Sequence, residues 1–375
     1  MTGLQEMKSK AAVLYSINSE LKVETLSVEE PKSNEVLIKI GAAGLCHSDV
    51  HVITGQAAQT LPCVLGHEGA GNVISCGDNV SKVVSGDRVI LSWIPYCGIC
   101  YQCSKKRTHL CQTYQEVICD GTLMDRSCRF RKDGQDIRQL SMLGCWSEYA
   151  VVPEECCVKI SKEVPYEVAA LLGCAVTTGV GAAWNKAKLK AGDNVVIIGM
   201  GGVGLSILMA AKMTGASQII CIDKNASVKE LTSKFGATDF IESSIHQDVK
   251  SKIFELTKIG ADHVFESVGN RQIQQQALEY CCPGGQVTFV GLDGPEATIE
   301  LLTSNITRNE ITVTGSIYGS VCTERDFVVY SEKFLSGELP IDSLITRRYA
   351  LEDINQGLRH MLAGQAGRGV IVFAD

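Results

Sequence analysis

The chain has 375 residues, with 35 Lys and Arg against 42 Asp and Glu, so its formal net charge at pH 7 is -7. A chain of this length is too long to fold around one ordinary hydrophobic core. We therefore expect two domains that each bury an apolar interior. The mixed-sign, acidic balance offers no basic surface to nucleic acid or to an anionic membrane, and it favours a small molecule as the partner.

Seventeen cysteines are spread along the chain, and residues 1–10 lack the apolar core of a secretory signal peptide. We therefore expect reduced thiols in the cytoplasm, and no secreted disulfide framework. The least charged stretch, 165–184, contains Pro165, Glu167 and three glycines. A buried helix and turn is expected there, because a membrane span needs about 20 predominantly apolar residues without such breaks.

Short strand patterns dominate the first part of the chain. Segments 11–15, 35–40 and 87–91 alternate or run apolar, and frequent glycines separate them. This pattern predicts a β-rich domain. The basic cluster 105–107 and the mixed-charge segment 125–138 are expected to be solvated surface.

From Glu167 the pattern changes to apolar helix and then to alternating strands and helices. The expected strands are Asn194–Ile198, 218–222, 262–266 and 286–290. Such alternation predicts an α/β fold with a parallel, doubly wound sheet. The chain closes with a strand pattern at 370–373, which is placed to rejoin the first domain.

A glycine-rich turn joins the first of these strands to a helical pattern. In Gly199-x-Gly201-x-x-Gly204, Gly199 permits the turn, Gly201 lets the backbone approach a pyrophosphate, and Gly204 lets the helix pack closely on the strand. The motif alone is weak evidence, and a turn without any ligand is the alternative. Asp223, nineteen residues after Gly204, strengthens the prediction that the turn binds a dinucleotide. A carboxylate there would bind the ribose hydroxyls of NAD and repel the 2′-phosphate of NADP.

Three residues far apart in the chain, in glycine-flanked contexts, have the chemistry of a catalytic zinc site: Cys46, His67 and Cys174. Two thiolates and one imidazole suit Zn²⁺, and they leave a fourth tetrahedral position for water or substrate. Taken singly, Cys174 is most often a core residue and His67 a structural one. Only their joint presence indicates a metal site.

A second cysteine group has the spacing of a closed metal site, Cys97-x2-Cys100-x2-Cys103-x7-Cys111. Four thiols within fifteen residues favour a structural Cys₄ zinc site. The alternatives are an iron-sulfur cluster, a redox pair and coincidence, but the ferredoxin spacing differs and a redox pair needs only two of the four. His109 is a possible substitute ligand that the spacing does not require.

Together these motifs resemble those of the zinc-dependent medium-chain alcohol dehydrogenases, over essentially the whole chain. The long loop between Cys111 and Tyr149 resembles the liver and plant type of subunit. The resemblance implies a GroES-like catalytic domain at 1–177 and 320–375, with a structural zinc lobe at 97–111. It implies a Rossmann NAD-binding domain at 178–319. One catalytic and one structural zinc per subunit would be held by the two ligand groups described above.

The resemblance also implies roles for residues near the ligands. Asp49 would steady the His67 imidazole, and Glu68 would lie beside the metal site, although ordinary hydrogen bonding is an alternative for both acids. Ser48 and His51 would pass the alcohol proton through the nicotinamide ribose to solvent. The alternative is a chance pair with a surface histidine.

Cofactor contacts follow from the same resemblance. Thr178 and Val203 would pack behind the nicotinamide ring, while His47 and Arg368 would contact the pyrophosphate. Lys224 would add a ribose or phosphate contact, or be a solvated lysine. The full set of expected cofactor residues is His47, Thr178, Gly199, Gly201, Gly202, Val203, Gly204, Asp223, Lys224 and Arg368.

The expected reaction is the reversible, NAD-linked oxidation of primary alcohols to aldehydes. Trp93, Ala57 and Leu140 are expected to line an apolar substrate pocket, with Tyr114, Leu292 and Ile317 as further walls. The first alternative is an S-(hydroxymethyl)glutathione dehydrogenase. That branch uses an acid near Ala57 and an arginine where this chain has Gln115, and both are missing. The second alternative is a non-catalytic, zinc-stabilised NAD-binding protein.

Relatives with the long loop are usually dimers, so the resemblance implies a homodimer. The segment 305–318 could supply the edge strand that pairs across a two-fold axis. A strand buried within one subunit would have the same apolar pattern.

Overall fold

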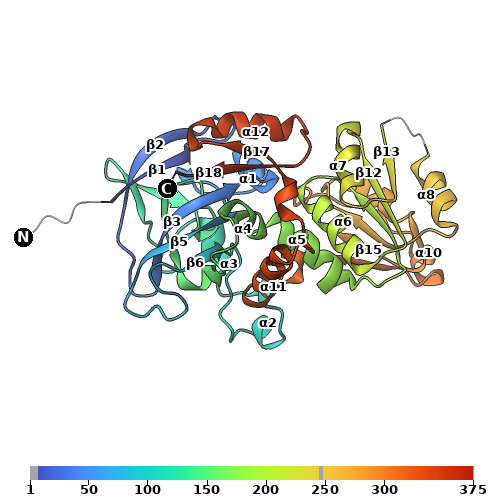
Figure 1. Ribbon diagram of the computed structural model, residues 1–375, viewed down its shortest axis with the longest axis horizontal. Helices are drawn as coiled ribbons and strands as arrows, with labels where there is room; N and C mark the ends of the chain where they lie inside the picture. The colour runs from blue at the N-terminus through green and yellow to red at the C-terminus, as the bar shows by residue number, and fades with distance from the viewer. Residues whose placement is uncertain (1–6, 245–247, 375) are drawn as a thin grey trace, which may run out of the picture.

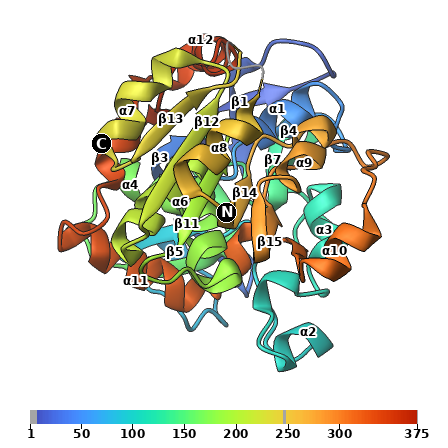
Figure 2. The ribbon, with the colours of Figure 1, turned by 90° about the vertical axis from the view of Figure 1, so that its right-hand side faces the viewer.

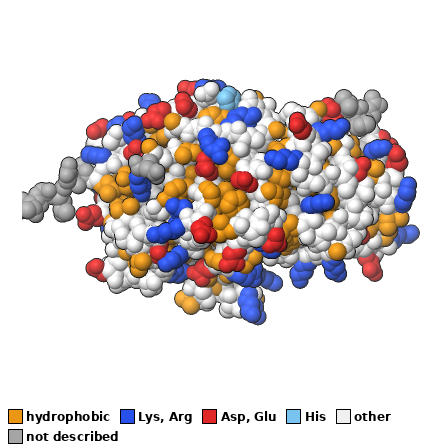
Figure 3. Space-filling model, viewed as in Figure 1, with side chains coloured by type: hydrophobic (Ala, Val, Ile, Leu, Met, Phe, Trp, Pro, Cys, Tyr) orange, Lys and Arg blue, Asp and Glu red, His pale blue; other side chains and the backbone are white. Residues whose placement is uncertain are grey.

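The computed structural model describes residues 7–244 and 248–374; residues 1–6, on which the signal-peptide expectation partly rests, lie outside this part. The chain forms two lobes that lie end to end (Figure 1). One lobe is β-rich and contains both the early strands and the last segment of the chain, and the other contains a parallel sheet. Acidic and basic side chains are interspersed over the face shown in Figure 3.

Two β-structures build the first lobe. A closed barrel contains β1 (Met7–Leu14), β2 (Lys22–Val28), β7 (Phe130–Lys132), β8 (Gln135–Gln139) and β4 (Cys63–Val64). A second sheet runs in the order β10 (Cys157–Ile160), β6 (Arg88–Leu91), β5 (Gly69–Cys76), β3 (Glu35–Gly44), β18 (Arg368–Val372) and β17 (Ile345–Tyr349), and β9 (Tyr149–Pro153) pairs with β3. The predicted β-rich domain is confirmed. Ile38 and Ile40 of β3 are fully buried, because this strand has neighbours on several sides.

The mixed-charge segment 125–138 is only partly solvated surface, so that expectation is wrong for its buried residues. It contains β7 and β8, whose Phe130 and Ile137 are fully buried. Arg129 is also fully buried, and its guanidinium donates to Glu35 at 2.5 and 2.7 Å and to Asp125 at 2.8 Å. Arg129 of this segment therefore has a charge partner, Glu35, inside the fold. The cluster 105–107 is exposed, as predicted.

The second lobe contains six parallel strands in the order β13 (Asp239–Glu242), β12 (Gln218–Asp223), β11 (Asn194–Ile198), β14 (Ala261–Glu266), β15 (Cys281–Phe289) and β16 (Thr312–Gly315). The four predicted strands and the doubly wound, parallel sheet are confirmed. The strand order reverses between β11 and β14. At such a switch point, the crevice beyond the carboxyl ends of the strands is the usual ligand site of an open α/β sheet.

Helices cover both faces of this sheet (Figures 1 and 2). On one face α6 (Gly202–Thr214) buries every residue from Gly204 to Ala211, and it packs with Val195 and Ile197 of β11. It ends at Gly215, whose φ of 83° is the left-handed conformation that commonly terminates helices. The other helices of this lobe are α7 (Lys229–Lys234), α8 (Val249–Thr257), α9 (Arg271–Ala277) and α10 (Thr303–Arg308).

The chain enters the second lobe through α4 (Tyr166–Leu172), α5 (Ala175–Gly181) and the π-helix η4 (Ala182–Ala187). Residues Val168 to Leu172 and Ala175 to Gly181 are buried, so the helix and turn expected at 165–184 are confirmed. In the described part of the chain, no single helix is long and apolar enough to cross a membrane. Tyr166–Leu172 and Ala175–Ala187 pass that test only as a pair, bent by 52°.

The return path completes the first lobe. It runs through η6 (Tyr318–Ser320), α11 (Thr323–Leu335) and α12 (Ile354–Leu362) to β18, which pairs antiparallel with β3. The predicted rejoining strand is thus confirmed. The predicted domain boundary at 177/178 falls inside α5, and the exact division stays a prediction. The remaining elements include α1 (His47–Ile53), α2 (Tyr101–Ser104), α3 (Gln115–Asp120), η1 (Thr108–Leu110), η2 (Leu140–Met142), η3 (Glu154–Cys156), η5 (Ala226–Val228), η7 (Ile341–Leu344) and η8 (Leu351–Asp353).

Candidate active site

Cys46, His67 and Cys174 meet in the first lobe, although they come from three different connections. Cys46 precedes α1, His67 lies between β4 and β5, and Cys174 lies at the break between α4 and α5. Their ligand atoms and one oxygen of Glu68 all lie within 4.8 Å of one another. His67 Nε2 is buried and has no hydrogen-bond partner in the described part of the chain. A buried polar atom needs a partner, so two sulfurs and this nitrogen fit a zinc ion.

Asp49 fixes the imidazole ring of His67. Its fully buried carboxylate lies 3.2 Å from His67 Nδ1 and accepts a hydrogen bond from Gly66 N at 2.9 Å. With Nδ1 facing the carboxylate, Nε2 is the ring nitrogen left for a metal. The hydrogen bond with Cys174 lowers the pKa of Cys46 well below its usual range, helped by the nearby His67. The lowered pKa favours the Cys46 thiolate, which is the form that binds zinc.

Glu68 and Arg368 form a buried ion pair that the sequence did not reveal. Arg368 Nη2 donates to Glu68 Oε2 at 2.5 Å and to Leu45 O at 2.8 Å. The other Glu68 oxygen accepts from Ala175 N at 3.1 Å. Burial raises the pKa of Glu68 to about 7, although the charge of Arg368 lowers it. Arg368 therefore contacts a residue of the predicted metal site as well as lying beside the first residue of α6.

The four cysteines of the second group also converge. The sulfurs of Cys97, Cys100, Cys103 and Cys111 lie within 4.8 Å of one another, in a small lobe that contains α2 and protrudes from the catalytic part (Figure 1). Cys97 N and Cys100 N donate to sulfurs of the group at 3.4 and 3.3 Å. Burial opposes ionisation, but hydrogen bonds from Thr113 and backbone amides lower the pKa of Cys97 to about 6. This arrangement fits a closed zinc site, and His109 is not among its members.

The glycine-rich turn has the expected shape. Gly199 has φ of +91°, and a Cβ on Gly204 would lie 1.9 Å from Gly199 O, so a side chain at either position would be strained. A Cβ on Gly201 would meet no atom within 4 Å, so this glycine borders open space in front of α6. Asp223 Oδ2 accepts from Met200 N at 2.7 Å. The carboxylate is thereby held beside the turn, where a ribose would lie.

Some of the other residues predicted to bind the cofactor pack against this turn. A Cβ on Gly179 would lie 2.4 Å from Val203 O, which shows how closely α5 packs against the first turn of α6 and brings Thr178 near Val203. A Cβ on Gly202 would lie 2.5 Å from Arg368 Nη1. His47 and Lys224 are exposed to solvent. The open cradle, the fixed acid and the adjacent cation fit a dinucleotide.

Known proteins share this organisation. A family model described as "Alcohol dehydrogenase GroES-like domain" matches residues 32–162, and one described as "Zinc-binding dehydrogenase" matches residues 202–334. An "NDMA-dependent alcohol dehydrogenase" of Amycolatopsis methanolica is 38% identical, over 98% of this chain and 100% of its own. The chain belongs to the zinc-dependent medium-chain alcohol dehydrogenase family.

Two further relatives show the range of this family. An "S-(hydroxymethyl)glutathione dehydrogenase" of Saccharomyces cerevisiae is 37% identical, over 97% of this chain and 96% of its own. The crystal structure of benzyl alcohol dehydrogenase from Acinetobacter calcoaceticus has a TM-score of 0.93 at 31% identity, and the match covers 98% of this chain and 100% of that one. This protein is thus a zinc- and NAD-dependent oxidoreductase of the alcohol dehydrogenase family, and the resemblance inferred from its motifs is confirmed.

The predicted proton relay of this dehydrogenase lies on and around α1. Ser48 Oγ is 3.7 Å from Cys46 Sγ, and Ser48 is exposed, whereas His51 lies one turn further along and is half-buried. Within residues 7–244 and 248–374, no direct hydrogen bond joins Ser48 to His51. A proton relay between these two residues therefore needs a third group. The predicted relay includes such a group, the nicotinamide ribose.

Trp93 lies beside His67, one of the predicted zinc ligands. Its ring meets the edge of His67 with centroids 6.2 Å apart and leans on Tyr318 at 4.8 Å. Leu140 is 9% exposed and Ala57 is half-buried, and both pack in the same core cluster as Trp93. Tyr114 instead lines a hollow of about 470 Å³ next to Cys97 in the structural lobe, which does not support its expected role as a pocket wall.

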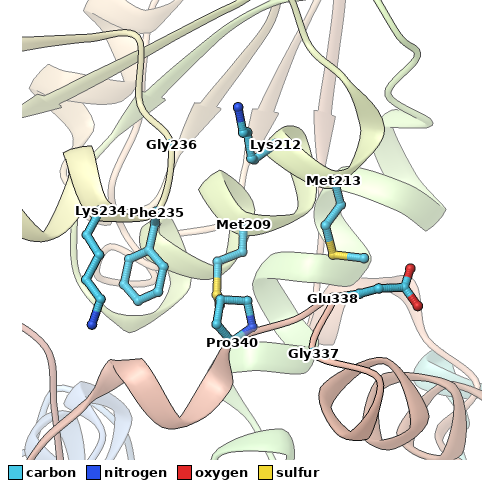
Figure 4. A pocket seen from close by; sticks show the side chains of 9 residues that line it. All are labelled: Met209, Lys212, Met213, Lys234, Phe235, Gly236, Gly337, Glu338 and Pro340. Carbon is cyan, nitrogen blue, oxygen red and sulfur yellow. The ribbon is translucent and has the colours of Figure 1, made fainter.

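Another hollow, of about 230 Å³, lies at the far end of α6 from the glycine turn (Figure 4). Met209 and Phe235 line it from the second lobe, and Pro340 lines it from the segment after α11. It contains none of the residues predicted for zinc, cofactor or substrate. This hollow therefore plays no part in the proposed chemistry.

Proposed function

We propose that this dehydrogenase oxidises primary alcohols reversibly to aldehydes, with hydride transfer to NAD, at the site formed by Cys46, His67 and Cys174. The observation that carries the proposal is the convergence of these three ligand atoms within 4.8 Å, next to Arg368, which also borders the start of α6. Zinc, when bound there, supplies the positive charge that makes an alcohol hydroxyl acidic.

The residues of this chain supply the remaining steps. Ser48 accepts the alcohol proton, and His51 receives it through the nicotinamide ribose and passes it to solvent. Thr178 and Val203 support one face of the nicotinamide, and Asp223 selects NAD over NADP by repelling a 2′-phosphate. The apolar walls Trp93, Leu140 and Ala57 bind the hydrocarbon part of the alcohol and exclude water.

NADH formation with a panel of primary alcohols tests this proposal. Absorbance at the NADH band should rise with short, long or aromatic alcohols in a protein that contains about two zinc ions per chain. NADP should be a poor substitute, and Asp223→Ser should reduce that discrimination. Two zinc ions without any NADH formation would contradict the proposed activity.

A second candidate substrate is S-(hydroxymethyl)glutathione, because several relatives at 35–37% identity bear that activity in their names. The residues argue against it, since Ala57 and Gln115 offer no charge to a glutathione carboxylate. Turnover of formaldehyde should therefore not increase when glutathione is added. A large increase in kcat/KM with glutathione would instead favour this second candidate.

We further propose a homodimer that forms through β16. This strand is the edge of the six-stranded sheet, and Leu301 and Leu302, close before it in the chain, are 46% and 76% exposed. Pairing two copies across a two-fold axis would satisfy the open edge and cover these leucines. Light scattering should give twice the mass of the 40.4 kDa chain.

A reducing compartment such as the cytoplasm is the proposed location. All seventeen cysteines are free, and several lie in the two proposed metal sites, where thiolates are required. Fractionation of cells that express a tagged full chain would test the location. Recovery outside the cytoplasm would contradict it.

A further inference from the structure

Tyr318 lies where the chain leaves the parallel sheet and returns to the first lobe, and it is 1% exposed. Its hydroxyl donates to Gly173 O at 2.6 Å, and its ring lies 4.8 Å from the ring of Trp93. Gly173 immediately precedes Cys174. We propose that Tyr318 is a positioning residue that holds the turn bearing Cys174 and orients the substrate-facing Trp93.

The first part of this proposal concerns the break between α4 and α5. At such a break, the last carbonyl groups of the first helix lose their intrahelical partners, and buried carbonyl groups require other donors. Thr177 Oγ1 donates to Leu172 O at 2.6 Å, and Tyr318 donates to Gly173 O. Two side-chain hydroxyl groups therefore satisfy the backbone carbonyl groups at the break where Cys174 lies. Without the Tyr318 hydroxyl, the carbonyl of Gly173 loses this donor and the turn can relax.

The backbone around Tyr318 fixes the direction of its side chain. Tyr318 has φ of +50°, a left-handed conformation that is uncommon for an aromatic residue. Gly319 follows with φ of +66°, and a Cβ there would lie 2.4 Å from Thr177 O and 2.9 Å from Gly181 Cα. The η6 backbone is thus pressed against α5. Such an unfavourable conformation persists only where its surroundings determine it.

The second part concerns Trp93. The Tyr318 ring is supported from behind by Phe327, with centroids 6.4 Å apart and planes at 89°, and it supports Trp93 in front. Trp93 in turn meets His67 at 6.2 Å. This row of rings leads from α11 to a proposed zinc ligand. Removing the Tyr318 ring would leave a space into which Trp93 can turn, which would reshape the wall of the alcohol pocket.

Tyr318→Phe tests the role at Cys174, because it removes only the hydroxyl. We expect zinc affinity at the catalytic site to fall about tenfold or more, the range found when a group that orients a metal ligand is lost. Competition with a chelator measures this affinity. The visible absorption of Co²⁺-substituted protein should shift as well, since it reports ligand geometry.

Tyr330→Phe is the matched control. Tyr330 is 2% exposed and packs on Trp184 at 5.8 Å, and its hydroxyl has no hydrogen-bond partner among the described residues. The control should keep the zinc affinity and Co²⁺ spectrum of the parent. If Tyr318→Phe also keeps both, Tyr318 does not position Cys174, and that part of the proposal is wrong.

Tyr318→Leu tests the role at Trp93, because it also removes the ring. The ratio of kcat/KM for a bulky alcohol to that for ethanol should change about tenfold, as a change of pocket shape produces, whereas Tyr318→Phe should keep the parental ratio. An unchanged ratio in Tyr318→Leu overturns this part. If Tyr318→Leu does not fold, Tyr318→Trp, which enlarges the ring, takes its place. A changed ratio of kcat/KM then supports this part of the proposal, and an unchanged ratio overturns it.

The inference rests on the proposed role of Cys174 as a zinc ligand, and the two can fail separately. Two zinc ions retained in Cys174→Ala would contradict the ligand assignment itself. Loss of one zinc in Cys174→Ala, together with an unchanged zinc affinity in Tyr318→Phe, would contradict only the role of the Tyr318 hydroxyl. Zinc binding is measured without turnover, so a failure of the proposed activity does not obscure either result.

Discussion

The guanidinium of Arg368 lies between the buried carboxylate of Glu68 and the first residue of α6. Its Nη2 donates to Glu68 Oε2 at 2.5 Å, and a Cβ on Gly202 would lie 2.5 Å from its Nη1. The metal site and the cofactor turn come from different lobes, yet they share one positive charge. A change at this residue should therefore affect both.

Arg368→Met tests this connection. The change leaves Glu68 buried without its charge partner, so the free energy of unfolding should fall by about 3–5 kcal/mol, and NADH affinity should fall with the loss of a cation at α6. Urea unfolding and NADH fluorescence titration measure the two effects. Arg359→Met is the control: its side chain is 63% exposed and pairs with Glu20. It should change stability by less than about 1 kcal/mol.

Two alanine substitutions in the glycine turn should have opposite consequences. Gly201→Ala places a methyl group in open space, so the protein should fold with little change in stability but bind NADH weakly, because the methyl occupies the pyrophosphate position. Gly204→Ala places the methyl 1.9 Å from Gly199 O and should destabilise the fold by about 1–3 kcal/mol. Unfolding curves and NADH titration separate the two. Unimpaired NADH binding by Gly201→Ala would contradict the proposed cradle.

Removal of single cysteines should distinguish the two zinc sites. Cys174→Ala should keep one zinc ion per chain and abolish NADH formation with little effect on thermal unfolding, because an open site is catalytic. Cys111→Ala should lose the other zinc ion and lower Tm by about 4 °C or more, because a closed site contributes folding energy. Cys119→Ala, at an exposed cysteine outside both groups, should keep both ions. Metal analysis and calorimetry check these outcomes.

The buried Arg129 should be far more important for stability than its exposed neighbour in the same hairpin. Arg129→Ala leaves Glu35, which is 8% exposed, without its partner, and should cost about 3–5 kcal/mol. Arg131 pairs with Glu29 and Asp136 at the surface, where its side chain is 45% exposed. Arg131→Ala should cost less than about 1 kcal/mol. Similar losses in both variants would show that burial of Arg129 does not matter.

His263 gives a prediction about pH. Burial lowers its pKa below the usual 6.5, although Asp193, 3.3 Å away, opposes the shift. The unfolded chain therefore binds a proton before the folded one does, so stability should decrease as pH falls below about 6.5, by at most about 1.4 kcal/mol per pH unit. His263→Gln should remove the contribution of His263 to the dependence of the free energy of unfolding on pH. Urea unfolding between pH 7 and 5 measures it, and an unchanged slope would contradict the assignment.

The proposed zinc ligands and the glycine turn could be predicted from the sequence because the residues of each group occur together in informative contexts, although a single residue such as Cys174 indicates little. Cys97 and Cys100 are close in sequence, and Gly199 and Gly204 lie in one turn, so local spacing already carries their chemistry. Cys46, His67 and Cys174 were predicted from their residue types and their joint presence in glycine-flanked contexts, and the family resemblance assigned them to catalytic zinc. Their convergence is a geometric result that no spacing could give.

The missed features all depend on partners far away in the chain. The Arg129 pair with Glu35 spans 94 residues, the Tyr318 hydrogen bond to Gly173 spans 145, and the Arg368 pair with Glu68 spans 300. Composition describes 125–138 as a charged loop, and nothing local indicates that one arginine is buried. Arg368 was predicted as a phosphate contact, but its pairing with Glu68 was not foreseen.

The pairing of β18 with β3 has a consequence for synthesis on the ribosome. The six strands of the parallel sheet form one continuous stretch, so that sheet can assemble as soon as β16 has emerged. The first lobe must wait until β18 has been synthesised, because this strand lies well after β16 and pairs with β3. Until then, Glu68 lacks its counter-ion, and a nascent chain cut short before Arg368 would be a target for chaperones and proteases.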